Sequence, residues 1–224
     1  VVIHYNSSAD AAEDLAAELA SAETVRADLC DDDAGTEMVA QLAPRLADWR
    51  ALINCASVFE ADDVTALDPA INRRAMQINA RAPALLAQAY LRHARSKAGR
   101  HVVQVTDQKL ANPNPDFFSY TMSKHALDAT IAMLAMGAAR EDDRIYGLAP
   151  GAILASHDQS PEEAERSHRM NLLGRRTTAE EVADAAVFLA SGHLASGLTL
   201  YVDSGQHLLR QERDVIYLAR EQAG

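Results

Sequence analysis

Short apolar runs rich in β-branched residues alternate with longer helical patterns along almost the whole 224-residue chain. The expected strands are residues 1–5, 24–27, 51–54, 101–106, 144–149 and 198–202. The expected helices are residues 9–20, 38–49, 68–95, 118–140 and 178–190. Strands that alternate with helices form a parallel sheet with helices on both faces. We therefore expect an α/β, doubly wound fold whose ligands bind beyond the carboxyl ends of the strands.

The charge balance and the cysteine count narrow the partners that this chain can bind. The 21 basic and 32 acidic side chains give a formal net charge of −11, whereas nucleic acids and anionic membranes attract basic faces. No apolar run approaches the ~20 residues that span a bilayer, and no secretory signal is visible. Two cysteines are too few for a disulfide scaffold or a four-ligand zinc site, and the eight histidines show no metal-ligand spacing. We expect a cytoplasmic protein with a small-molecule substrate and with no metal, nucleic-acid or membrane partner.

Tyr120 and Lys124, near the start of the helix expected at 118–140, are the strongest catalytic candidates. Their i, i+4 spacing places both side chains on one helix face, about 6 Å apart at Cβ. A nearby ammonium favours the phenolate, so we expect the lysine to lower the tyrosine pKa from its usual value of about 10. Such a tyrosine can transfer a proton near neutral pH. The alternative is a surface tyrosine that lies along a lysine side chain.

Several segments, in chain order, resemble motifs of the short-chain dehydrogenase/reductase family. The matching segments are Asp28-Leu29, Asn54-Cys55-Ala56-Ser57, Asn79, Tyr120-Thr121-Met122-Ser123-Lys124, Ala149-Pro150-Gly151 and Tyr201-Val202-Asp203-Ser204-Gly205. They resemble, among others, the family's Tyr-x-x-x-Lys motif and its Asn-Asn-Ala-Gly stretch. The resemblance covers residues 1 to about 208 and implies a single Rossmann-like domain over residues 1–224, with residues 209–224 as a C-terminal tail.

The resemblance also implies roles for the matched residues. Tyr120 would supply a proton, Lys124 would hold the ribose hydroxyls of a nicotinamide cofactor, and Asn79 would anchor a water that links Lys124 to solvent. The residues implied to contact the cofactor are His4, Tyr5, Asn6, Ser7, Ser8, Asp28, Leu29, Asn54, Ala56, Ser57, Tyr120, Lys124, Pro150, Gly151 and Ile153. Residues 4–8 contain no acid that would repel a 2′-phosphate, which favours NADP (NADPH) over NAD, although no arginine stands in this turn.

Asp107 stands thirteen residues before Tyr120, where the family usually has a serine. An aspartate there resembles the pteridine reductase and dihydromonapterin reductase branch of the family, as do residues 54–59 and the turn at 4–8. An ionised carboxylate accepts hydrogen bonds from the N–H groups of a 2-amino-4-oxo-pyrimidine, and Phe59 would stack on the pterin ring. A turn cap for Asp107 and ordinary core packing for Phe59 are the alternatives.

The family's glycine-rich phosphate loop is missing, because no glycine precedes Gly35. The chain begins at what resembles the family's second strand, so we expect it to be N-terminally incomplete, without the first strand and helix. The resemblance implies an NADPH-dependent reductase of a pterin-like or other C=N substrate. A carbonyl reductase or alcohol dehydrogenase is the alternative within the family. A cofactor-free protein with a binding or scaffolding role is the alternative from another class.

Small side chains mark two of the expected helices. The helix at 68–95 carries Ala80, Ala82, Ala84, Ala87 and Ala89, and the helix at 118–140 carries Ala126, Ala129, Ala132, Ala135, Gly137, Ala138 and Ala139. Family members pair these helices across a two-fold axis, which implies a homodimer or a homotetramer. The alternative is close packing of both helices against the chain's own sheet.

Overall fold

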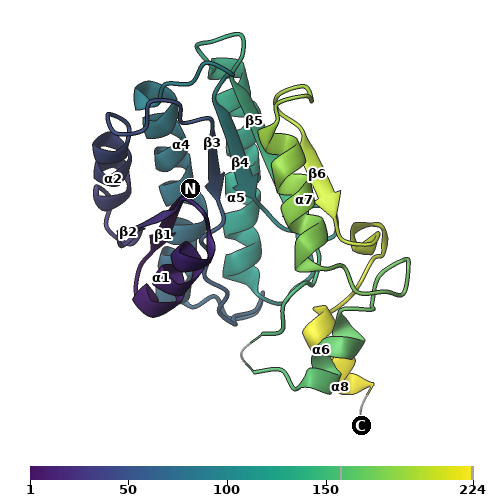
Figure 1. Cartoon of the computed structure of the whole chain (residues 1–224). Coiled ribbons are helices and arrows are strands. Elements are labelled where there is room, and N and C mark those ends of the chain that lie inside the picture. Colours follow the sequence, from purple (N-terminus) through teal and green to yellow (C-terminus); the bar gives the residue numbers. More distant parts are fainter. Residues whose placement is uncertain (157, 223–224) are drawn as a thin grey trace.

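The computed structural model describes residues 1–156 and 158–222, and it confirms the expected alternation of strands and helices (Figure 1). Residues 223 and 224 of the expected tail lie outside this description. The strands are β1 (Val2–Tyr5), β2 (Glu23–Arg26), β3 (Ala51–Asn54), β4 (His101–Val105), β5 (Arg144–Pro150) and β6 (Thr199–Val202). The helices are α1 (Ala9–Glu18), α2 (Ala34–Leu42), α3 (Pro69–Ala75), α4 (Ala82–His93), α5 (Phe118–Gly137), α6 (Pro161–Ser167), α7 (Ala179–Ala190) and α8 (Val215–Glu221), with a π-helix η1 (Met76–Arg81) and the 3₁₀ turns η2 (Gln108–Leu110) and η3 (Gln206–Leu208).

Within the described residues, all the strand ladders are parallel, but the strands form two sheets instead of one. β1 pairs with β2, and β3, β4, β5 and β6 pair in that order. The family resemblance implies a further buried central strand, and here no ladder joins β1 to β3 among the residues described. β3 is therefore an edge strand, and its Ile53 side chain is 46% exposed.

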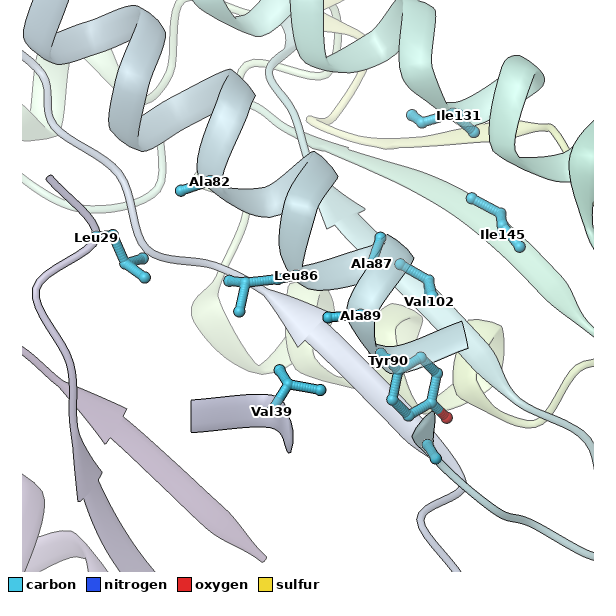
Figure 2. Close-up of a cluster of buried hydrophobic side chains, with 11 residues drawn as sticks. Leu29, Val39, Ala82, Leu86, Ala87, Ala89, Tyr90, Val102, Ile131 and Ile145 are labelled. Carbon is cyan, nitrogen blue, oxygen red and sulfur yellow. The ribbon is translucent and has the colours of Figure 1, made fainter. Parts of the chain in front are cut away.

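Helices cover both faces of the four-stranded sheet, because successive strand residues point to opposite faces. Val102 is fully buried against α4, where Leu86, Ala87 and Tyr90 join it in one core cluster (Figure 2). Its neighbour Val103 is buried in a second cluster on the α7 face. Apolar side chains on both faces thus hold the strands in one layer between two layers of helices. None of the described helices combines the length and the apolarity needed to cross a bilayer.

Two expected helices differ from the structure. The helix predicted at 38–49 spans Ala34–Leu42 instead, because Pro44 has no backbone N–H to continue the helical hydrogen bonds. The single pattern predicted at 68–95 is α3, η1 and α4 in succession. Asp68 caps its start by accepting hydrogen bonds from the backbone N–H groups of Ala70 and Ile71.

The alanines predicted to pair between subunits divide into two groups. Those of η1 and α4 mostly pack inside the chain, since Ala80, Ala82, Ala87 and Ala89 are buried. The end of α5 is different, because Met133 and Met136 are 65% and 83% exposed there. Packing inside the chain, largely against neighbouring helices, therefore accounts for the buried alanines of η1 and α4, while part of α5 faces outward.

Candidate active site

A cavity of about 700 Å³ lies at the carboxyl ends of β3, β4 and β5. The predicted site residues that line it are Ser57, Phe59, Asp107, Tyr120, Lys124, Pro150, Gly151 and Ile153. Ligands of parallel sheets bind at this edge. The structure thus brings the predicted proton-transfer residues and the Pro-Gly segment together around one space.

The first turns of α5 carry Tyr120 and Lys124 to this cavity. Phe117, just before the helix, adopts a left-handed backbone with φ of 53°. Asp62 accepts hydrogen bonds from the backbone N–H of Ser119, at 2.9 Å, and from its hydroxyl, which holds the start of the helix. Lys124 Nζ then donates to the carbonyl of Val105, the last residue of β4, at 2.8 Å.

Asp107 follows β4 and uses both of its carboxylate oxygens. Oδ1 accepts the backbone N–H of Lys109 at 2.8 Å and so caps the turn η2. Oδ2 accepts the Tyr120 hydroxyl at 2.7 Å. The turn cap and the contact with the site, which sequence reasoning treated as alternatives, therefore occur together.

Burial dominates the protonation of these three groups. It raises the pKa of Asp107, against the opposing charges of Lys109 and Lys124. Burial and the adjacent Asp107 carboxylate raise the pKa of Tyr120 well above its usual value. Burial also lowers the pKa of Lys124. The expectation that Lys124 lowers the Tyr120 pKa is wrong in this structure, where the partner of the phenol is a carboxylate and Lys124 donates to Val105.

Phe59 lies at the cavity with one face of its ring already covered. It stacks on Phe117 at 4.0 Å between ring centroids and meets Tyr120 edge to face at 4.7 Å. It is half-buried and also lines the cavity. Packing against other aromatic rings and access to a ligand are thus both present at this residue.

Asn79 lies in the π-helix η1 and is 1% exposed. Its Oδ1 accepts hydrogen bonds from the Val58 N–H at 2.8 Å and the Ser57 hydroxyl at 3.1 Å. Its Nδ2 donates to the Val58 carbonyl at 2.9 Å and to the Ser123 Oγ at 3.0 Å. These four bonds use the full hydrogen-bonding capacity of the side chain, which leaves it none with which to anchor a water.

The Pro150-Gly151 segment approaches the C-terminal part of the chain closely. A side chain at Gly151 would meet Gln206 Oε1 at 2.7 Å and the Asp203 Cβ at 2.8 Å. Gln206 Oε1 also accepts the backbone N–H of Ala152 at 3.0 Å. Glycine is therefore required here to let the backbone pass, and the segment reaches the cavity in a fixed position.

The other predicted cofactor residues lie outside the cavity lining. They are His4, Tyr5, Asn6, Ser7, Ser8, Asp28, Leu29, Asn54 and Ala56. His4 Nε2 lies 2.9 Å from the carbonyl of Ala27, and the Leu29 side chain is buried in the core, which leaves only its backbone for a ligand. Asn54 donates to Gln104 Oε1 at 2.9 Å and to the Pro83 carbonyl at 3.2 Å. Asn6, Ser7, Ser8 and Asp28 are exposed at the carboxyl ends of β1 and β2.

Several residues beside the 4–8 turn and in the cavity wall were not predicted from the sequence. The Arg26 Nε donates to the Asn6 carbonyl at 3.1 Å, so an arginine does stand beside the 4–8 turn, contributed by the neighbouring strand. The parallel register of Tyr5 with Arg26 brings it there. Cys55, Lys109 and Asp214 line the cavity as well. Cys55 lies within the recognised 54–57 segment and Lys109 only two residues after Asp107, so their positions could have indicated them, whereas Asp214 follows the last recognised motif.

The chain matches a known protein family and resembles proteins whose structures have been solved. The family model described as Enoyl-(Acyl carrier protein) reductase matches residues 1–207. The crystal structure of FolM Alternative dihydrofolate reductase 1 from Brucella canis, complexed with NADP, is 33% identical with a TM-score of 0.86, over 96% of this chain and 86% of that one.

Two curated relatives carry pterin-related names. A dihydromonapterin reductase of Escherichia coli is 25% identical over 191 residues, which are 84% of this chain and 79% of that protein. Pteridine reductase 1 of Leishmania tarentolae is 30% identical over 113 residues, 49% of this chain and 39% of that protein. These matches favour an enzyme over a binding or scaffolding protein. The chain belongs to the short-chain dehydrogenase/reductase family of oxidoreductases.

Proposed function

We propose that the protein reduces a pterin-like or other C=N substrate with NADPH. The observation that carries the proposal is the 2.7 Å hydrogen bond from the Tyr120 hydroxyl to Asp107 Oδ2 at the wall of the cavity. It places a proton donor beside a carboxylate, whereas a serine at position 107 would present a hydroxyl. The names of the relatives from Escherichia coli and Leishmania tarentolae support the same substrate class.

The residues present fit nicotinamide adenine dinucleotide phosphate (NADP). Lys124, Pro150, Gly151 and Ile153 line the cavity where the reacting end would bind. Arg26 and the exposed hydroxyls of Ser7 and Ser8 offer a cation and hydrogen-bond donors to a 2′-phosphate. The NADP bound to the Brucella canis relative supports this choice. When bound, the cofactor supplies a hydride.

The chain's own residues then handle the proton and the orientation of the substrate. The carbon of the C=N bond gains the hydride and its nitrogen gains a proton, so the product is an amine. The raised pKa keeps Tyr120 protonated at neutral pH, and Tyr120 supplies that proton. Asp107 holds the hydroxyl in place and offers its remaining lone pairs to N–H groups of the substrate. Phe59 lines the same space and is held there by its stacking on Phe117.

The substitution Asp107→Ser tests the substrate class. It removes a charge-assisted hydrogen bond to the aminopyrimidine, which contributes about 1.5–3 kcal/mol, so kcat/KM for 7,8-dihydrobiopterin should fall by roughly 10- to 150-fold. Reduction of a simple ketone should stay constant or rise, because a hydroxyl donor then faces the carbonyl oxygen. The measurement is the ratio of the two kcat/KM values in the variant and the parent.

Tyr120→Phe is the control, because loss of the proton donor should depress both reactions in a folded protein. An unchanged ratio in Asp107→Ser would contradict the pterin assignment and favour a carbonyl reductase.

A further inference from the structure

The chain that follows β6 contributes to the cavity wall. Asp214, Val215 and Ile216 line the same cavity as Tyr120, and their exposed fractions are 5%, 5% and 7%. The rest of α8 packs on α6, and the two helices lie together at the lower right of Figure 1, apart from the sheet. The first turn of α8 therefore closes one side of the cavity.

Ile216 joins the aromatic side chains at this end. It is buried in one cluster with Phe117 and Tyr120, and the half-buried Phe59 and Tyr217 pack against that cluster. An apolar side chain from α8 thus belongs to the same cluster as the proposed proton donor. Its size limits the space beside the reacting groups.

A buried ion pair fixes this turn in place. Lys109 Nζ lies 2.6 Å from Asp214 Oδ2, and the two side chains are 5% and 7% exposed. Lys109 Nζ also donates to Asn114 Oδ1 and to the Asp116 carbonyl, both at 3.3 Å. Asp214 Oδ1 accepts the backbone N–H of Ile216 at 3.0 Å. Removal of one partner would leave the other charge buried and uncompensated.

Lys109 connects this ion pair to Asp107. Its backbone N–H donates to Asp107 Oδ1 at 2.8 Å, while its ammonium binds Asp214. The carboxylate beside Tyr120 and the first turn of α8 are thus both held by one residue. A displacement of Lys109 would therefore move both the Asp107 carboxylate and the first turn of α8.

Building on the proposed function, we propose that Asp214 and Ile216 determine substrate specificity and that Lys109 is a positioning residue that holds their segment against Asp107. The carboxylates of Asp107 and Asp214 and the apolar side chain of Ile216 all line the cavity. That combination matches a flat nitrogen heterocycle with N–H donors along one edge. A substrate without such donors gains nothing from the carboxylates.

Steady-state kinetics of Ile216→Ala and Asp214→Asn test the specificity role. Each should raise the KM for 7,8-dihydrobiopterin about 10-fold or more, with a smaller change in kcat and an unchanged Kd for NADPH. The KM for a small ketone should change less than twofold in Asp214→Asn. The proposal would be overturned if the pterin KM of both variants equalled that of the parent.

Limited proteolysis tests Lys109 without any substrate. Lys109→Met should release the C-terminal segment, and trypsin should cut after Arg213 or Arg220 about 10-fold faster than in the parent. The double variant Lys109→Met/Asp214→Asn removes both charges, so it should recover stability while its KM for the pterin stays high. Unchanged cleavage in Lys109→Met would contradict the positioning role.

Arg100→Met is the matched control, because Arg100 forms a buried pair with Asp143 at 2.6 Å, at the opposite end of β4. It should lower the melting temperature and leave both the pterin KM and the C-terminal cleavage unchanged. A parent that does not reduce the pterin would count against the proposed function alone, since the cleavage comparison needs no substrate. The specificity role would then be tested by the Kd of the pterin in the parent and in Asp214→Asn, which needs no turnover, and equal Kd values would contradict it.

Discussion

Asp107 shows how one carboxylate can serve the fold and the site together. Oδ1 caps the start of the turn η2 after β4, and Oδ2 holds the Tyr120 hydroxyl. A buried carboxylate is costly to ionise, and here two hydrogen bonds and the charge of Lys109 offset only part of that cost, so the pKa of Asp107 stays raised. The side chain therefore keeps a fixed position without occupying all its lone pairs.

The raised pKa of Asp107 predicts how stability depends on pH. A carboxyl group whose pKa is higher in the folded protein than in the unfolded chain makes folding less favourable above that pKa. This penalty disappears as the pH falls below the usual aspartate value of about 3.9. Asp107→Asn cannot ionise, so its stability relative to the parent should improve as the pH rises through the raised pKa. Urea unfolding of both proteins across this range measures the difference, and a constant difference would show that burial does not control this group.

Arg26 predicts cofactor preference. Its guanidinium lies against the Asn6 backbone at the exposed turn after β1, where a 2′-phosphate would bind. Arg26→Ala should raise the KM for NADPH about 10-fold through loss of a charge-assisted contact and leave the KM for NADH unchanged. Arg45→Ala is the control, because Arg45 pairs with Glu23 at the other end of β2. Equal increases for both cofactors would remove Arg26 from the phosphate site.

Among the elements, the π-helix η1 connects the strand β3 loop to α5. Asn79 makes all four of its side-chain bonds across this junction, two of them to Val58. Asn79→Ala would leave several buried polar groups unpaired, so the free energy of unfolding should fall by about 3 kcal/mol or more. Asn72→Ala, in α3, removes a bond to the Ser119 hydroxyl and a long, weak one to the Met122 sulfur, so the free energy of unfolding should fall by only about 1 kcal/mol. Urea denaturation of both variants measures these free energies. Equal decreases would show that the hydrogen bonds of Asn79 contribute no more to stability than those of Asn72.

Elements with a strong local signal could be predicted from the sequence, and elements that depend on distant contacts could not. The apolar runs at 51–54 and 101–106 and the start of α5 at Phe118 agree with the structure. The helices α6 and α8 were missed because each has only seven residues, which is too short for a clear periodic pattern, and because they pack on each other. The π-helix inside the 68–95 pattern has no periodicity of its own to reveal it. Arg26 and Lys109 reach the site through strand register and a buried ion pair, which a linear motif does not show.

At the scale of the whole molecule, the outward face of α5 predicts self-association. Met133 and Met136 expose large apolar side chains on this helix, and apolar groups favour a contact that removes them from water. We expect a dimer or tetramer at micromolar concentration. Met133→Lys should shift light scattering to a smaller mass, whereas Val64→Lys, at a 56% exposed loop residue, should not. A parent that is monomeric would contradict this expectation.

The two cysteines also give the molecule a built-in chemical reporter. Both thiols are exposed, one inside the cavity at Cys55 and one at Cys30 beside Asp28. Partial burial and the Asp28 carboxylate raise the pKa of Cys30, so this thiol should react more slowly with an alkylating reagent at neutral pH. A dinucleotide that extends from the cavity to Asp28 would shield both thiols, whereas a small substrate would shield only Cys55. Mass spectrometry of the two alkylated peptides would therefore read the occupancy of each end of the binding cleft separately.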